Sequence, residues 1–274
     1  MPTEHWFVTG MSRGFGKTLC EELLERGHRV VGTTRNGSSD LAHDNLTVMQ
    51  LDVTDEQQTE QVIKRAIAQL GRIDVVVNNA GFGMVGAVEE VSAEEAQATF
   101  ATNFFGTLHV IRAVLPHFRT NHAGHIVNFS SVGGITGSAG FGIYNAAKFA
   151  VEGLSEALDL ELKPFGIKVT IVEPGYFRTE FLSPDSIKKA GKLVDAYAET
   201  AGKARDNISS RSGHQPGDPA KAVRVIIQAV ESPSPPLRLP LGPDCYARID
   251  VKLSRLKNDI DRWREIASAT QFDQ

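Results

Sequence analysis

The sequence predicts an α/β fold in which helices cover both faces of a doubly wound parallel sheet. Three observations predict this fold. Short runs rich in β-branched residues alternate with segments of helical period up to about residue 175, several of the short runs are apolar almost throughout, and a glycine-rich turn follows the first run. Apolar strands are typical of parallel sheets because helices bury both of their faces.

Six short runs are predicted to be the strands. They lie at residues 6–8, 29–33, 46–51, 73–77, 125–129 and 167–172. Because helical segments separate them, the crossovers are expected to be right-handed. No linker interrupts the alternation before residue 180, so residues 1–274 are expected to form a single domain.

The helices are predicted from apolar spacing and from start signals. Phe15, Leu19 and Leu23 follow at intervals of four, which is the spacing of one helix face. Residues 54–57 (Thr-Asp-Glu-Gln) and 92–95 (Ser-Ala-Glu-Glu) are typical of capping boxes. Asp218 followed by Pro219 is typical of an N-cap and the first helical residue.

The chain after residue 180 differs from the part before it. Residues 180–217 are polar and less regular, and are expected to form a mobile lid that binds substrate. Residues 243–267 are expected to form a C-terminal helical extension. We interpret its narrow apolar stripe as packing against the parent domain rather than as a subunit contact, because three heptads are the lower limit for a coiled coil. The stripe is Tyr246, Ile249, Leu253, Leu256, Ile260, Trp263 and Ala267.

Composition excludes several classes of function. The formal net charge of −4 gives no basic footprint for nucleic acid or for an anionic membrane. Cys20 and Cys245 are too few and too far apart for a disulfide framework, which favours a reducing, cytoplasmic location. The N-terminus lacks the pattern of a signal peptide, and no apolar run reaches the length of a membrane span.

A glycine-rich loop between the first strand and the first helix predicts a dinucleotide site in a Rossmann-type sheet. The loop runs through Thr9, Gly10, Met11, Ser12, Arg13, Gly14, Phe15 and Gly16. Glycines let the chain turn tightly and approach a pyrophosphate, whose charge is met by the amides of the helix N-terminus. A tight turn that merely needs small residues is the alternative, but it does not explain three glycines.

The second strand indicates which dinucleotide is bound. An acidic residue at its end would bind the ribose hydroxyls of NAD, but this chain has Arg35 there. Arg35 and Arg13 offer guanidinium groups suited to a 2′-phosphate, so NADP is favoured over NAD. Ordinary surface charge is the alternative for either arginine.

Tyr144 and Lys148 are the candidates for acid–base chemistry. Residues four apart lie on one face of a helix, so the ammonium of Lys148 can lower the pKa of the Tyr144 phenol. Ser131, if it folds nearby, could hold a carbonyl oxygen while Tyr144 transfers the proton. Taken alone, the spacing also fits two surface neighbours. The sequence has no H-E-x-x-H or Cys/His cluster, so no metal is expected.

Further motifs occur in order along the chain. They are the T-G-x-x-x-G-x-G loop, Asn78-Asn79-Ala80-Gly81 after the fourth strand, the set Asn103, Ser131, Tyr144 and Lys148, and Pro174-Gly175 with Thr179 after the sixth strand. Together these motifs resemble the short-chain dehydrogenase/reductase family, in its compact single-domain branch, over residues 5–180, about two-thirds of the chain. More weakly, the helix-rich tail and residues 174–179 (Pro-Gly-Tyr-Phe-Arg-Thr) resemble the branch that includes 17β-hydroxysteroid and retinol dehydrogenases.

The resemblance implies catalytic roles. Tyr144 would donate or accept the proton, Ser131 would orient the substrate oxygen, and Lys148 would hold the nicotinamide ribose and lower the phenol pKa. Asn103 would support a water leading away from Lys148. These roles predict a hydride transfer between the cofactor and a carbonyl or secondary alcohol.

The resemblance also implies the cofactor residues. Asp52 and Val53 would flank the adenine, residues 79–81 would line the adenosine side, and Thr179 would contact the carboxamide. The full expected set is Gly10, Ser12, Arg13, Gly14, Phe15, Gly16, Arg35, Asp52, Val53, Asn79, Ala80, Gly81, Tyr144, Lys148, Pro174, Gly175, Phe177 and Thr179.

The expected substrate is a small lipophilic ketone, aldehyde or alcohol, because several candidate pocket residues are aromatic, although each could equally be core. The alternative function is an NADP-binding redox sensor or scaffold without turnover. The family suggests a homodimer or homotetramer. The pocket candidates are Phe82, Gly83, Ser138, Ala139, Gly140, Phe141, Tyr176, Phe177, Phe181 and Leu182.

Overall fold

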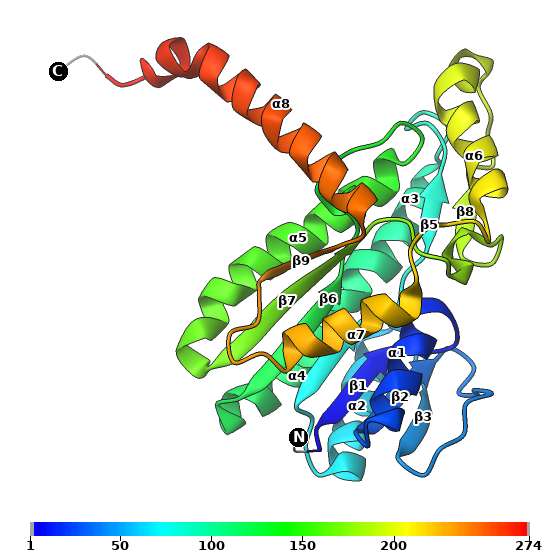
Figure 1. Ribbon diagram of the computed structural model, residues 1–274, viewed down its shortest axis with the longest axis vertical. Helices are drawn as coiled ribbons and strands as arrows, with labels where there is room; N and C mark the ends of the chain where they lie inside the picture. Colours follow the sequence, from blue (N-terminus) through cyan, green and yellow to red (C-terminus); the bar gives the residue numbers. More distant parts are fainter. Residues whose placement is uncertain (1–2, 273–274) are drawn as a thin grey trace.

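A computed structural model of the chain describes residues 3–272. Its centre is a seven-stranded parallel sheet with the order β3-β2-β1-β4-β6-β7-β9 (Figure 1), which confirms the predicted doubly wound fold. The order reverses direction between β1 and β4, and ligands bind at such switch points. The strands are β1 His5–Thr9, β2 Arg29–Thr34, β3 Leu46–Gln50, β4 Val75–Asn78, β6 Gly124–Phe129, β7 Ile167–Pro174 and β9 Arg238–Leu241.

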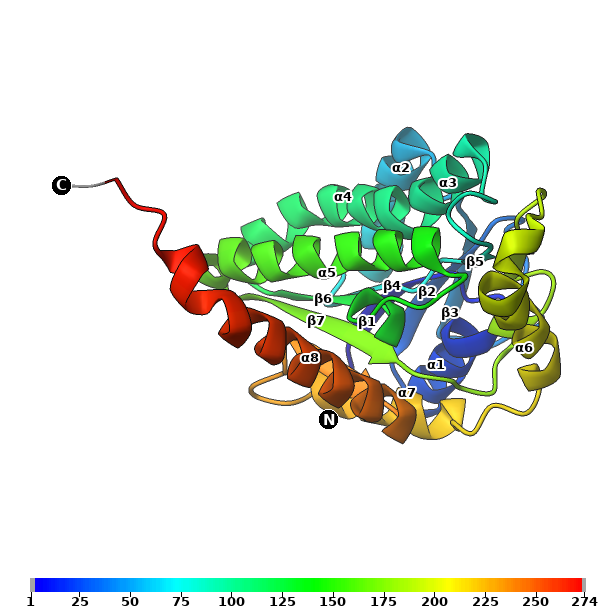
Figure 2. The same ribbon diagram turned by 90° about the horizontal axis from the view of Figure 1, so that it is seen from above.

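Two layers of helices sandwich the sheet (Figure 2). Helices α2 (Glu56–Leu70), α4 (Gly106–Asn121) and α5 (Gly142–Leu162) cover one face, and α1 (Gly14–Glu25) and α7 (Pro219–Val230) cover the other. Successive side chains of a strand point to opposite faces. Phe7 of β1 therefore enters the first core, while Trp6 and Val8 enter the second.

The start signals of the helices are confirmed at two positions and wrong at one. Ser92 forms a full capping box with Glu95 at the start of α3 (Ala93–Phe100), and Asp218 caps α7. The box predicted at residues 54–57 is wrong, because α2 is capped by Asp55. Asp52 accepts hydrogen bonds from the amide and hydroxyl of Thr54, at 2.9 and 2.7 Å, and holds that residue in a turn before the helix.

Residues 180–217 contain more regular structure than the sequence predicts. They include β8 (Ile187–Lys189), which pairs with β5 (Gly83–Val85) in a small second sheet, and α6 (Lys203–Arg211). Short helical turns lie at Glu180–Leu182, Asp195–Tyr197 and Ala198–Gly202. Val85, Leu182, Ile187 and Ile208 form a separate hydrophobic cluster beneath them. The segment is therefore an ordered subassembly beside the main sheet.

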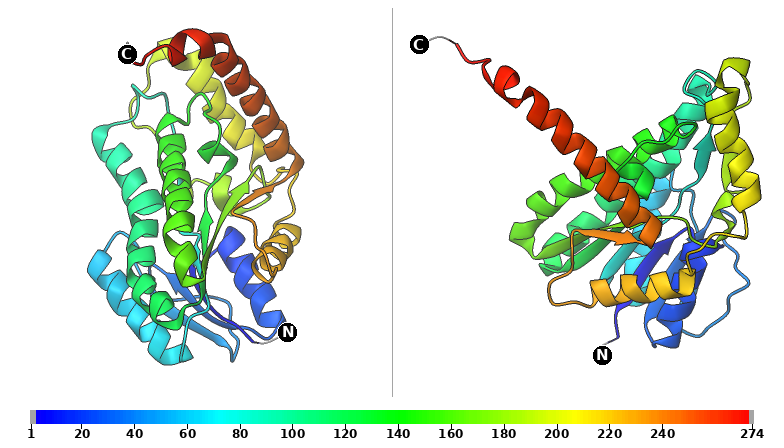
Figure 3. Two further views of the ribbon diagram at one scale, coloured as in Figure 1. Left: turned by 90° about the vertical axis from the view of Figure 1, so that its left-hand side faces the viewer. Right: turned by 45° about the horizontal axis from the view of Figure 1, so that its top comes forward.

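The C-terminal helix α8 (Pro243–Ser268) projects from the body of the molecule (Figures 1 and 3). Only its first turns are anchored: Cys245 is buried, and Arg248 Nη2 donates to Ser138 Oγ at 2.6 Å. The expected packing of its apolar stripe against the parent domain is wrong, since Leu253 and Trp263 are 55% and 56% exposed. Asp244, which accepts from Tyr176 N at 2.9 Å, fixes the start of the helix and hence its direction.

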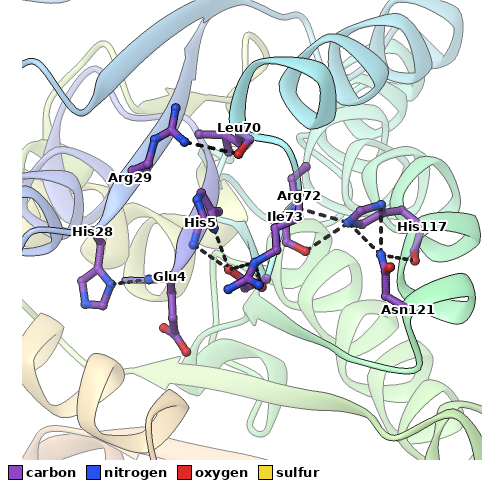
Figure 4. Close-up of polar contacts among 10 residues, drawn as sticks. Glu4, His5, His28, Arg29, Leu70, Arg72, Ile73, His117 and Asn121 are labelled. Atoms are coloured by element: carbon purple, nitrogen blue, oxygen red, sulfur yellow. Dashed lines mark hydrogen bonds and ion pairs between the residues drawn. The ribbon is translucent and has the colours of Figure 1, made fainter. Parts of the chain in front are cut away.

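Polar contacts close the amino edge of the sheet (Figure 4). The amide of His5 donates to Asp74 Oδ2 at 2.8 Å, and the His5 ring lies 3.0 Å from the same oxygen. The Ile73 amide donates to His117 Nε2 at 3.2 Å, and Asn121 Nδ2 donates to the His117 carbonyl at 2.9 Å. These contacts fix the ends of β1 and β4 that lie opposite the carboxyl edge.

Candidate active site

A cavity of about 410 Å³ opens at the carboxyl edge of the sheet. It extends from the end of β2 past the glycine loop to the start of α5. Most of the predicted cofactor and catalytic residues line it. They are Gly10, Ser12, Arg13, Gly14, Phe15, Arg35, Asp52, Val53, Asn79, Ala80, Gly81, Ser131, Tyr144, Lys148, Pro174, Gly175, Phe177 and Thr179.

Two predicted residues, Gly16 and Asn103, lie behind the cavity wall. A Cβ on Gly16 would lie 2.3 Å from the Gly10 carbonyl oxygen and 2.5 Å from Asn79 Nδ2, so this glycine lets α1 pack closely on the loop. Asn103 is fully buried, and its side chain makes two hydrogen bonds of 2.9 Å with the backbone of Phe82. Asn103 lies in a π-helical turn, Ala101–Phe105, and positions the backbone of Phe82 in the cavity wall.

The glycine loop fits the phosphates of a dinucleotide. Gly10 and Gly14 have φ of +70° and +56°, a region that favours glycine. The amide of Gly14 donates to Glu180 Oε2 at 3.0 Å, so an anion already lies at the N-terminus of α1. Because Glu180 is exposed on a neighbouring turn, its carboxylate can be exchanged for a phosphate.

Arg35 and Arg13 both line the cavity but have different surroundings. Arg35 is exposed, and its carbonyl accepts from Gln50 Nε2 at 3.0 Å. Arg13 Nη1 lies 3.5 Å from Asp185 Oδ2 in an exposed ion pair. Exposed pairs of this kind contribute little and exchange readily. Both guanidinium groups therefore remain available to an anionic ligand.

Tyr144 and Lys148 lie on consecutive turns of α5 and face the cavity. Both are nearly buried, and Lys148 Nζ donates to the Phe129 carbonyl at 2.8 Å. Burial raises the pKa of Tyr144 to about 12, and a hydrogen bond from Ser131 only partly offsets the rise. Burial also lowers the pKa of Lys148 to about 8, which Glu152 partly opposes.

The expected effect of Lys148 on the phenol is wrong for this structure. Its ammonium lies 6.0 Å from the centroid of the Tyr144 ring and is directed at the Phe129 carbonyl. Burial therefore dominates, and the pKa of Tyr144 rises rather than falls. The phenol is consequently protonated at neutral pH and can act as a proton donor.

Ser131 is held beside Tyr144 by a short 3₁₀ turn, Val132–Gly134. Its Oγ accepts from the Gly133 amide at 3.0 Å. Asn145 fixes the same turn, because its Nδ2 donates to the Gly133 carbonyl and its Oδ1 accepts from Ser138 N, each at 2.9 Å. Asn145 was not among the predicted site residues, although its position between Tyr144 and Lys148 on the same helix could have indicated a role at the site.

A buried ionic cluster supports the strand end that carries Ser131. Ser130 Oγ donates to Glu152, and Arg238 Nη1 lies 2.6 Å from Glu152 Oε2 and 2.5 Å from Glu173 Oε1. Burial and the neighbouring Glu152 raise the pKa of Glu173 to about 7. The cluster joins α5, β7 and β9. No local sequence motif predicts it, because its residues lie far apart in the chain.

The end of the cavity beyond Tyr144 is largely aromatic. The Phe181 ring lies 5.9 Å from the Tyr144 ring, centroid to centroid. Gly83, Ala139 and Gly140 do not line the cavity, so these candidates were wrong. Gly83 packs on Ile187, and Gly140 packs on α6 and the preceding turn. The candidates that do line it are Phe82, Ser138, Phe141, Tyr176, Phe177, Phe181 and Leu182.

Other residues that line the cavity were not predicted. Lys188, Gln215 and Arg248 reach the cavity from β8, from the loop before α7 and from the base of α8. They lie in segments without a motif, so only the fold brings them to the site. Within residues 3–272, no helix is long and apolar enough to cross a membrane. The same residues contain no group of three or more His, Cys, Asp or Glu side chains that could hold a metal.

Comparisons with known proteins agree with this geometry. A family model described as short chain dehydrogenase matches residues 4–190. A 3-ketodihydrosphingosine reductase of Bacteroides thetaiotaomicron is 39% identical over 236 residues, which cover 86% of this chain and 87% of that protein. Retinol dehydrogenase 8 of Bos taurus is 36% identical over 259 residues, covering 84% and 79%.

Two solved structures have the same fold. The crystal structure of a short-chain dehydrogenase from Streptomyces avermitilis matches with a TM-score of 0.92 and 39% identity, covering 98% of each chain. ElxO with NADP bound matches with a TM-score of 0.69 and 27% identity, covering 87% of this chain and 97% of that chain.

Proposed function

The chain belongs to the short-chain dehydrogenase family of nicotinamide-dependent oxidoreductases, and we propose that it is an NADP-dependent carbonyl reductase or alcohol dehydrogenase. One observation carries the proposal: Ser131, Tyr144 and Lys148 line the same cavity as the glycine loop. This arrangement supports a reaction in which a hydride donor and a proton donor act on one substrate.

The side chains at the site have separate roles in the reduction. The glycine loop, Lys148 and Thr179 would hold a nicotinamide cofactor, which would supply a hydride for the carbonyl carbon. Tyr144 donates its phenolic proton to the carbonyl oxygen, so one hydride and one proton convert the ketone or aldehyde to an alcohol. Ser131 donates a hydrogen bond to that oxygen, and Lys148, which lines the same cavity, holds the nicotinamide ribose. The reverse sequence oxidises an alcohol.

The preference for NADP rests on Arg35. Its exposed guanidinium lies at the cavity, where the adenosine ribose is expected. Replacement by alanine should lower the ratio of kcat/KM for NADPH to that for NADH by about 10- to 100-fold, the size of one charge-assisted contact. Arg112→Ala, at an exposed surface pair with Glu56, is the matched control. An unchanged ratio in Arg35→Ala would remove this residue from the assignment.

We propose a lipophilic ketone or aldehyde as the substrate, because Phe141, Tyr176 and Phe181 line the catalytic end of the cavity. The names of the sphingosine-type reductase and the retinol dehydrogenase support this class. NADPH oxidation should be faster with long-chain or polycyclic ketones than with short polar ones. NADPH binding without turnover on the whole panel would instead favour a sensor or scaffold.

Residues 180–217 are proposed to act as the lid of this cavity. Phe181, Leu182 and Gln215 from this segment line it, and the exposed Glu180 carboxylate accepts from the Gly14 amide, where a phosphate is expected to bind. Cys20 and Cys245 are both free and buried, which supports the proposed cytoplasmic location.

A further inference from the structure

Helix α8 presents an apolar stripe that the rest of the described chain leaves uncovered. Each residue from 253 to 272 is exposed, although Leu256 and Ile260 are large and apolar. The helix has 26 residues, so it is about 39 Å long. An isolated helix is only marginally stable in water, and packing of its apolar face normally supplies the stability. This stripe therefore requires a partner.

The spacing of the stripe identifies the kind of partner. Apolar residues recur at alternating intervals of three and four from Tyr246 to Ala267, the heptad pattern of a seam between two helices. A helix that lies on a lipid surface has a broad apolar face and an excess of basic residues. Here the segment 243–268 carries six basic and five acidic side chains. The balance favours a protein helix of mixed charge.

We propose that this partner is α8 of a second copy of the chain, packed antiparallel about a two-fold axis beside residues 254 and 255. In this register Leu253 lies opposite the partner's Leu256, and Ile249 lies opposite the partner's Ile260. Tyr246 lies opposite the partner's Trp263. The symmetry repeats each layer, so the seam is filled over nearly the whole helix.

The charges beside the seam select the antiparallel orientation. Antiparallel helices place Asp250 next to the partner's Lys257 and Lys252 next to the partner's Asp259. Both pairs are attractive, and symmetry doubles them to four. A parallel pair would place Lys252 next to the partner's Lys257, which is repulsive, and Asp259 next to the partner's Arg264, which is attractive, so the two contributions would largely cancel. Lys257 also contacts Asp261 on its own helix, but that pair is exposed and exchanges readily.

The test is light scattering coupled to size exclusion on the full-length protein, over a range of concentrations. The double variant Leu253→Asp/Leu256→Asp should lose one association step, which halves the mass of the assembly. Lys252→Asp should raise the dissociation constant at least about tenfold, and Lys252→Asp/Asp259→Lys should restore it. Glu265→Lys, on the opposite face of the helix, is the control. NADPH binding should be unchanged in each variant, which shows that the body is folded.

Several results would overturn the inference. Tighter association of Lys252→Asp would indicate a parallel pair, because the substitution turns a repulsive contact into an attractive one. Equal masses for the wild type and Leu253→Asp/Leu256→Asp would show that the stripe does not join two copies. If the wild type is monomeric and sediments with vesicles of phosphatidylcholine and phosphatidylserine, the stripe binds a lipid surface rather than a second copy of the chain.

Discussion

Replacement of Arg238 by methionine would test the buried cluster behind the active site. Methionine keeps much of the side-chain length but removes the guanidinium that lies 2.6 Å from Glu152 and 2.5 Å from Glu173. The side chain of Glu173 is 0% exposed and that of Glu152 is 7% exposed, so both carboxylates would be left in a largely dry environment.

The structure sets the size of the effect. Removal of one partner from a buried ion pair costs about 3–5 kcal/mol. Arg238 is itself 38% exposed, so water can reach the cluster and the lower value, about 3 kcal/mol, applies. For a chain of this size that loss lowers Tm by roughly 6–12 °C. Arg224→Met, which breaks an exposed pair with Glu22, should cost less than about 1 kcal/mol.

The loss should also depend on pH. The pKa of Glu173 in the folded protein is raised to about 7, above its ordinary 4.5, so stability from this group falls as pH rises through that interval. Without the guanidinium of Arg238 the pKa of Glu173 rises further, so the free energy of unfolding continues to fall with pH over a wider range in the variant than in the wild type. Urea unfolding should therefore show a larger difference between variant and wild type at pH 8 than at pH 6. A difference below about 1 kcal/mol at both pH values would refute the reasoning.

Three further predictions concern the glycine loop, the sheet and the phosphate position. Gly16→Ala should lower the free energy of unfolding in urea by about 1–3 kcal/mol and abolish NADPH binding, because its Cβ would lie 2.3 Å from a backbone oxygen. The control Gly153→Ala, in open space on α5, should leave the free energy of unfolding unchanged or raise it. Burial lowers the pKa of His125 to about 4, so the stability that this residue contributes above pH 6.5 should be lost as pH falls toward 4. The curve of unfolding free energy against pH should therefore be flatter for His125→Gln than for the wild type. Equal slopes for the two proteins would contradict this. Glu180→Gln should tighten NADPH binding by about three- to tenfold in a fluorescence titration, because the carboxylate that competes for the Gly14 amide loses its charge; unchanged affinity would count against competition.

The central sheet could be predicted because its strands are apolar on both faces. Three strands were missed for physical reasons. β5 and β8 have three residues each, too few for a visible period. β9 lies at the sheet edge and contains Pro240, which only an edge strand tolerates well. The local pattern therefore identified six strands of the main sheet, including the edge strand β3, and missed the two short strands and the proline-containing edge strand β9.

Motif spacing placed the glycine loop, Ser131, Tyr144 and Lys148 around one cavity, but it did not give their electrostatics. The interval of four between Tyr144 and Lys148 predicts a shared helix face, whereas burial sets the pKa of each group. Arg238 and Glu173 meet across 65 positions of sequence, for which no local signal exists. The stripe on α8 was visible in the sequence, but the direction of the helix depends on tertiary contacts at its base.

The measurement that tests the proposed chemistry most directly is NADPH oxidation by Tyr144→Phe with a lipophilic ketone. The variant keeps the ring and loses only the hydroxyl, so NADPH affinity in a fluorescence titration should stay close to that of the wild type. Turnover should fall by about 10²- to 10⁴-fold, because the proton donor is gone. Turnover equal to that of the wild type, with the same ketone and the same NADPH affinity, would contradict the assignment of Tyr144 as the proton donor.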